Sequence, residues 1–83
     1  MAGSVHSDAY RDFLKALVAL RNDKGMSQAE LAAKLRKPPS FVGKYELGER
    51  RLDVIELLAI LRELESDFGS FWAKAQIILP ERI

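Results

Sequence analysis

The stretch that most constrains the fold is residues 27–53, because it predicts two short helices separated by a tight turn. Ser27 and Glu30 have the S-x-x-E spacing of a capping box, in which each side chain bonds a backbone amide at the start of a helix. The adjacent Pro38 and Pro39 lack backbone N–H donors, so the first helix must end before them. Two helices joined by about three residues predict a helix-turn-helix unit.

The second helix of this unit is predicted to begin at Pro39 or Ser40, since proline suits the first position of a helix. Val42 and Tyr45 are expected to face inward, and Gly48 supplies the left-handed residue that commonly closes a helix. Four other positions of this helix are expected to point elsewhere: Ser40, Gly43, Lys44 and Leu47.

Three further helices are predicted from apolar periodicity and from cap residues. Ser7 caps and Gly25 terminates the first, while Asp53 with Glu56 repeats the capping-box spacing later in the chain. The predicted ranges are 8–24, 53–65 and about 67–79. The chain is therefore expected to be all-α with five helices.

The expected domain organisation is simple. Residues 1–6 show no periodicity and predict a flexible N-terminal tail, and residues 7–83 predict a single domain. A chain of 83 residues buries only about 60% of its unfolded surface, so a partner subunit would add useful burial.

The net charge of +1 conceals an uneven distribution. Residues 34–51 carry six basic and two acidic side chains, a net +4, whereas residues 52–83 carry three basic and six acidic, a net −3. A basic segment centred on one helix is typical of a phosphate-binding face, although a solvated charged surface is the ordinary alternative.

At these residues the chain resembles the lambda-repressor-like (Xre) helix-turn-helix family of bacterial and phage DNA-binding proteins. The segments SQAELAAKL and SFVGKYELGERR carry the resemblance, which extends from about Phe13 to about Leu64. Its linked features are Gln28, Ala32, Tyr45, Glu46 and Gly48. The chain departs from the family at Arg36, where many members have glycine, and at Pro38 and Pro39, where they have polar residues.

The resemblance implies a dimeric transcriptional regulator that binds double-stranded DNA and reads an inverted repeat through the major groove. A plasmid, phage or restriction-modification system is the expected setting, and the size also resembles controller proteins of restriction-modification systems. The alternative is a protein-interaction module, such as an antitoxin-like partner binder, that uses the same scaffold through Phe41 or the last helix. A purely structural oligomer would have no affinity for nucleic acid.

The candidate DNA contacts lie in and around the second helix of the unit. Lys44 can donate to guanine or hold a phosphate, Ser40 can donate or accept, and Phe41 can touch a thymine methyl. Phe41 is equally compatible with a place in the core. Arg50 and Arg51 are expected to be phosphate anchors rather than base readers. The full set of candidates is Gln28, Lys37, Pro39, Ser40, Phe41, Lys44, Arg50 and Arg51.

Two structural sites are also predicted. The resemblance implies that Arg21 pairs with Glu46 and so locks the recognition helix to the scaffold. The last helix carries more apolar side chains than one helix of a small monomer can bury, which predicts a dimerisation helix over about 67–79. Its proposed interface residues are Phe68, Phe71, Trp72, Ile77 and Ile78.

Composition argues against other classes of function. The chain has no cysteine and one histidine, His6, so neither the usual metal clusters nor a catalytic dyad can be assembled. We therefore expect no enzyme, no cofactor and no metal. No apolar run approaches the roughly 18 residues that a membrane span needs, which predicts a soluble, cytoplasmic protein.

Overall fold

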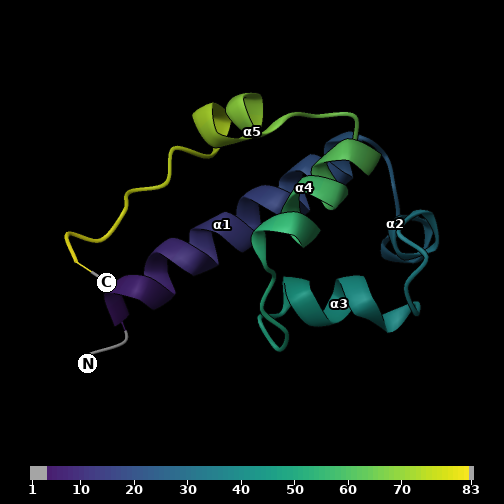
Figure 1. The fold of residues 1–83 in the computed structure, drawn as a ribbon, viewed down its shortest axis with the longest axis horizontal. Helices are drawn as coiled ribbons and strands as arrows, with labels where there is room; N and C mark the ends of the chain where they lie inside the picture. Colours follow the sequence, from purple (N-terminus) through teal and green to yellow (C-terminus); the bar gives the residue numbers. More distant parts are fainter. Residues whose placement is uncertain (1–3, 83) are drawn as a thin grey trace.

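The computed structural model describes the backbone of residues 4–82 and the side chains of residues 8–82. This part of the chain folds into five helices and contains no strand (Figure 1). The helices are α1 (Ser4–Asp23), α2 (Gln28–Lys34), α3 (Ser40–Glu46), α4 (Val54–Glu63) and α5 (Phe68–Ala75). Among the described residues, none of these helices combines the length and apolar composition needed to cross a bilayer.

The helices are arranged around α1 and α4. In Figure 1, α3 lies along one edge of the molecule and α5 along the opposite edge, with α1 and α4 between them. α2 packs on α3 and α4, and α1 contacts both α3 and α5. The extended segment after α5 runs back toward the beginning of α1, so the two ends of the described part of the chain lie on the same side of the molecule in Figure 1.

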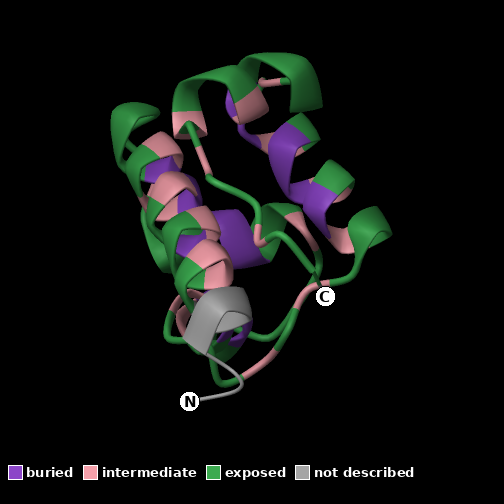
Figure 2. Cartoon of the chain, turned by 90° about the vertical axis from the view of Figure 1, so that its left-hand side faces the viewer, coloured by how far each residue is buried: buried purple, intermediate pink, exposed green. Residues whose placement is uncertain are grey.

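The core lies where α1, α2, α3 and α4 meet, and α5 adds Phe71 to it (Figure 2). Each helix contributes side chains at helical spacing, so that its apolar stripe faces the same interior. The largest fully buried side chains are Tyr45, Leu17, Leu31, Ile60, Leu61, Leu64 and Val42. The inward positions predicted for α3, Val42 and Tyr45, are confirmed.

The helix starts confirm both predicted capping boxes. The Ser27 hydroxyl accepts from the Glu30 amide at 3.0 Å, while the Glu30 carboxylate accepts from the Ser27 amide at 2.8 Å. Asp53 and Glu56 repeat the arrangement at the start of α4, at 2.7 and 3.0 Å. Such caps satisfy amides that have no partner within the helix.

The helix ends rely on left-handed residues. Gly25 and Gly48 follow α1 and α3 with φ values of 66° and 82°, which glycine adopts without steric cost. Arg36, with φ of 57°, takes this place after α2: its amide bonds to the Ala33 carbonyl, and the next amide bonds to the Ala32 carbonyl. The turn thus keeps the geometry that glycine usually provides, with an arginine in the strained position.

Two predicted boundaries were wrong. α1 begins at Ser4, so residues 4–6 of the predicted tail and the predicted cap Ser7 lie within the helix; residues 1–3 lie outside the described part of the chain. α5 ends at Ala75, before the predicted Leu79, because Gln76 is left-handed with φ of 50°. Pro80 therefore plays no part in ending this helix.

Candidate nucleic-acid interface

α3 has one buried face and one exposed face. Phe41, Val42 and Tyr45 enter the core, whereas Ser40 and Lys44 are exposed on the other side. The spacing of four residues places Ser40 and Lys44 next to each other on the helix surface. The structure therefore presents two of the predicted base-reading residues together on one solvent-facing stripe.

Phe41 does not belong to that stripe. Its side chain is only 7% exposed and meets the Tyr45 ring edge-on, with the centroids 5.6 Å apart. The prediction that Phe41 touches DNA was therefore wrong, and the alternative of a core residue is correct. Two cations cover its ring instead: Lys37 Nζ lies 5.4 Å and the Arg50 guanidinium carbon 4.9 Å from the centroid. Phe41 thus holds basic side chains at both ends of α3.

Arg50 is held by Glu56 as well as by this ring. Its Nη1 and Nη2 donate to the two carboxylate oxygens of Glu56 at 2.9 and 2.7 Å. The Arg50 guanidinium, together with the Asp53 amide that donates to the same carboxylate, lowers the pKa of Glu56 to about 2. A paired fork of this kind fixes the orientation of the guanidinium. The pair ties the loop after α3 to the first turn of α4.

A buried ion pair fastens α3 to α1. Arg21 Nε donates to Glu46 Oε2 at 2.7 Å and Arg21 Nη2 to Glu46 Oε1 at 3.0 Å. Arg21 Nη1 donates to the carbonyl of Met26 at 2.9 Å, and the hydrogen bond to Glu46 raises the Arg21 pKa. The structure thus contains the pair that the resemblance implied, with both side chains almost withdrawn from water.

Gln28 is a further member of this network. Its Nε2 donates to Glu46 Oε1 at 2.8 Å, so Glu46 links α2, α3 and α1. A Cβ at Gly43 would lie 3.5 Å from Gln28 Oε1, which is an ordinary van der Waals contact, so the amide lies directly beside this position of α3. The exposed Gln28 therefore has a defined position beside the outward stripe of α3 rather than a random one.

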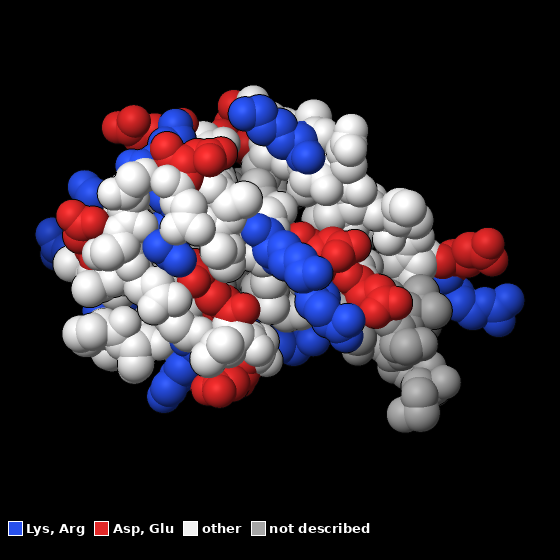
Figure 3. All heavy atoms as spheres, turned by 180° about the vertical axis from the view of Figure 1, so that it is seen from behind, with Lys and Arg blue, Asp and Glu red and all other residues white. Residues whose placement is uncertain are grey.

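The remaining candidates lie around α3. Lys37 and Pro39 are exposed in the turn, and Pro39 occupies the cap position of α3 without a side-chain hydrogen bond. Arg51 is exposed and lies over the Tyr10 ring of α1, 4.2 Å from its centroid. In the view of Figure 3, basic and acidic side chains alternate, with apolar and neutral surface between them. The face seen there thus has no uniform sign of charge.

The predicted dimer residues divide into three groups. Phe71 is buried and meets the Phe13 ring edge-on at 6.1 Å, so its assignment to an interface was wrong: it anchors α5 to α1. Phe68 stacks on Trp72 and remains 44% exposed. Ile77 and Ile78 lie beyond the end of α5, with Ile77 half-buried and Ile78 85% exposed.

An apolar groove adjoins this surface. Tyr10 and Phe13 of α1 form part of two neighbouring hollows, one bounded by Val54 and the other by Trp72 and Leu79. Each has a volume of about 230 Å³. The exposed side of α5 and the segment after it therefore continue into an apolar surface on α1.

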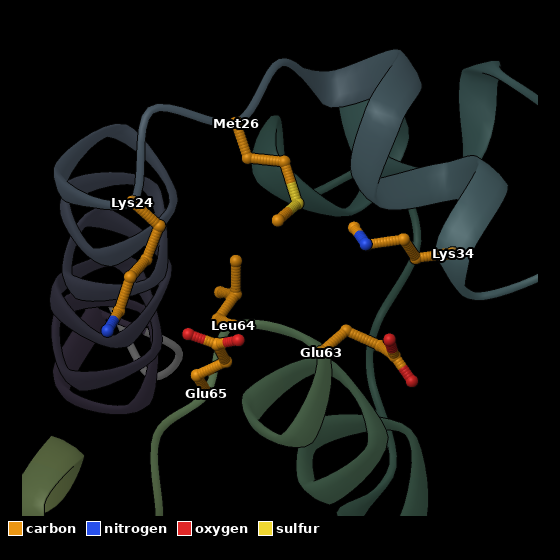
Figure 4. A pocket seen from close by; sticks show the side chains of 6 residues that line it. All are labelled: Lys24, Met26, Lys34, Glu63, Leu64 and Glu65. Atoms are coloured by element: carbon orange, nitrogen blue, oxygen red, sulfur yellow. The ribbon is translucent and has the colours of Figure 1, made fainter.

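A third hollow of about 230 Å³ lies where the ends of α1, α2 and α4 meet (Figure 4). Figure 4 shows Met26 and Leu64 between two lysines and two glutamates. Opposite charges of this kind neutralise one another, which gives the hollow no preference for an anion or a cation. Its lining residues are Lys24, Met26, Lys34, Glu63, Leu64 and Glu65.

Sequence reasoning missed two residues of this region. Glu56 was read only as a cap, because nothing in the sequence showed that Arg50 would reach it. Leu47 is 76% exposed, on the same stripe as Ser40 and Lys44, and was not considered as a contact. Its spacing of three residues from Lys44 and seven from Ser40 was the signal that could have identified it.

Comparisons with known proteins agree with this geometry. A helix-turn-helix family model matches residues 17–71. A solved structure described as an XRE-family like protein from Pseudomonas syringae pv. tomato is 39% identical to this chain. The match covers 90% of this chain and 92% of that chain, with a TM-score of 0.82. No curated protein matches the chain.

Proposed function

Because the chain belongs to the lambda-repressor-like (Xre) helix-turn-helix family, we propose that it is a dimeric transcriptional regulator that binds a specific double-stranded DNA sequence through α3. The observation that carries the proposal is the division of α3 into a buried face, which is fixed in place, and an exposed face. The buried face is fixed by the core and by Glu46, while the exposed face carries Ser40 and Lys44. A helix presented in this way fits the major groove, which is about 12 Å wide.

The proposed contacts follow from the positions of the side chains. Ser40 and Lys44 contact base edges, since they lie on the outward stripe of α3. Lys37 and Arg51 contact phosphates beside it, and Gln28 contacts a phosphate from the start of α2. Arg50 and Pro39 complete the set at the two ends of α3. Arg50 is the weaker phosphate contact, because Glu56 already neutralises much of its charge.

The proposed dimer uses α5 and the segment after it. The exposed Phe68 stacks on the half-buried Trp72, and Ile78 adds exposed apolar surface beyond the end of α5. Two-fold symmetry makes one such patch meet its own copy, and aromatic side chains dominate the energetics of interfaces. A two-fold dimer carries two copies of α3, so it reads an inverted repeat with half-sites about one helical turn apart.

Binding to duplex DNA at increasing salt concentration tests the proposal. Selection of bound sites from random duplexes provides the preferred site, and a scrambled duplex serves as the control. We expect tighter binding to the preferred site, with an affinity that falls steeply with salt because phosphate contacts release counterions. Equal affinity for both duplexes would contradict sequence-specific binding.

The protein-interaction module remains the second candidate, supported by exposed apolar side chains on α4. Val54, Ile55 and Leu58 are all exposed there, which is unusual for a small monomer. An apolar interface releases few ions, so binding to a protein partner would depend weakly on salt. Absence of DNA binding at low salt would favour this second function.

A further inference from the structure

Leu47 is an exposed apolar side chain at the end of α3. It is 76% exposed, although a leucine at a helix end gains stability from burial. The neighbours on its stripe, Ser40 and Lys44, are polar and exposed. The core therefore does not explain why position 47 is apolar.

The backbone holds Leu47 firmly in the helix. Its φ and ψ of −81° and −7° are helical, and its amide donates to the Gly43 carbonyl at 3.0 Å. The next residue, Gly48, closes the helix with φ of 82°. The side chain of Leu47 is thus presented from a rigid position.

The direction of the side chain brings it toward the middle of α3. Side chains in a helix lean toward its N-terminus and cover the preceding turn. The preceding turn contains Gly43, which has no side chain, and Lys44. Leu47 therefore belongs to the same surface that presents Ser40 and Lys44.

The dimensions of α3 suit a contact with bases. Leu47 follows Ser40 by seven positions, which is about 10 Å along a helix. Successive base pairs are about 3.4 Å apart, so the stripe spans about three base pairs of a groove that it follows. The group in the major groove that an apolar side chain recognises is the C5-methyl of thymine.

We propose that Leu47 is a specificity-determining residue that reads a thymine methyl group in each half-site. The inference rests on the proposed binding of DNA by α3. Leu47 thereby adds an apolar contact to the hydrogen-bonding contacts that Ser40 and Lys44 make with the bases. Since the methyl group is what it recognises, Leu47 distinguishes thymine from uracil at that position.

Deoxyuridine substitution tests this contact, because it removes the thymine methyl and leaves the base-pairing hydrogen bonds intact. Each thymine of the selected site is replaced in turn, and affinities are measured for the wild-type protein, Leu47→Ala and Leu47→Met. In each half-site we expect one thymine whose replacement by deoxyuridine weakens the binding of the wild-type protein. Each such single replacement should weaken binding by about fourfold, which is the effect of burying one methyl-sized group. Leu47→Ala should bind the thymine duplex and the deoxyuridine duplex equally. Leu47→Met should restore most of the preference for the thymine duplex.

A matched control is Ile55→Ala, which removes a 73% exposed apolar side chain from α4. Its preference for thymine should equal that of the wild type, and thermal melts should show that all variants are folded. Two results would overturn the role of Leu47 but not the proposed function. One is a preference for the thymine methyl that persists in Leu47→Ala, and the other is a wild-type protein that binds its site without any such preference. A wild-type protein that binds no duplex overturns the proposed function as well.

Discussion

Lys44 is the exposed cation of the outward stripe of α3, and its role can be separated from that of an ordinary phosphate contact. If it donates to a base edge, Lys44→Ala should cost about 1–3 kcal/mol of binding free energy on the preferred site. The preference at one base pair should relax, while binding to a scrambled duplex changes little. Affinities measured on both duplexes at several salt concentrations provide the test.

Lys37→Ala is the matched comparison for Lys44→Ala. Lys37 is also exposed, but it lies in the turn before α3, where it contacts the Phe41 ring. Loss of a phosphate contact should weaken binding to both duplexes alike and reduce the dependence on salt. Equal losses for Lys44→Ala on the two duplexes would make Lys44 a phosphate contact. The reading of bases would then fall to Ser40 and Leu47.

Arg36 stores strain in the turn between α2 and α3. A residue with a Cβ pays about 1–2 kcal/mol in the left-handed region, whereas glycine does not. We expect Arg36→Gly to raise the free energy of unfolding by up to about 1 kcal/mol, since the greater freedom of glycine in the unfolded chain offsets part of the gain. Denaturant melts measure this, with Arg36→Ala as a control that keeps the strain. A glycine variant no more stable than the alanine variant would contradict the strain argument.

Among the elements, α3 depends on α1 through the Arg21–Glu46 pair. Removal of one partner leaves the other charge buried, at a cost of about 3–5 kcal/mol for a buried pair. The double variant Arg21→Ala, Glu46→Ala should therefore lose less stability than the sum of the single variants. Additive losses in denaturant melts would show that the two side chains act independently. Gln28→Ala removes only the hydrogen bond from Gln28 to Glu46, so it should lower the stability less than the loss of either charged partner.

The link between the loop after α3 and α4 should be sensitive to acid. The pKa of Glu56 in the folded protein is about 2, below the value of about 4.3 in an unfolded chain. The Arg50–Glu56 pair therefore stabilises the fold fully above the unfolded value, and this contribution is lost as the pH falls from about 4.3 toward 2. Glu56→Gln should be less stable than the wild type near neutral pH, and the difference should shrink across this range.

Unfolding by urea at a series of pH values measures the difference. Glutamine still accepts from an amide in a capping box, so the substitution tests the ion pair more than the cap. Glu49→Gln, in the exposed loop that follows α3, is the control. A difference between wild type and Glu56→Gln that does not change with pH would contradict the assignment.

Element boundaries that depend on local chemistry were predictable from the sequence. The capping residues Ser27 and Asp53 act on amides three residues away, so their effect can be read from spacing alone. The end of α5 was missed because the left-handed conformation of Gln76 is not encoded by a glycine or a proline. The partners of Arg50 were missed because they depend on how the loop folds onto α4.

At the scale of the whole molecule, the stacked Phe68 and Trp72 of α5, of which Phe68 is exposed, predict self-association. We expect a dimer at micromolar concentration in sedimentation velocity runs. Phe68→Ala combined with Trp72→Ala should shift the protein toward monomer, since aromatic anchors contribute most of the energy of an interface. A wild-type protein that remains monomeric at these concentrations would contradict the dimer. Ile55→Ala on α4 is a surface control that should leave the dimer intact.

Phe71 shows why the interface was only partly predictable. Periodicity placed Phe71 on an apolar helix together with Phe68 and Trp72, but it does not distinguish the stripe that faces α1 from the stripe that faces outward. The structure buries Phe71 against Phe13 and leaves Phe68 exposed. The fold as a whole was predictable because five helices with clear caps and apolar stripes have few other ways to pack.

The division of α3 into a locked face and an exposed face bears on how such a regulator can diverge. Val42 and Tyr45 hold the helix in place, while Ser40, Lys44 and Leu47 contribute little to the core. Substitutions at the three exposed positions should therefore leave the fold nearly as stable as before. If α3 binds DNA as proposed, descendants of one gene duplication would acquire different operators by changing these positions alone, and the ancestral scaffold would pass unaltered from one protein to the next.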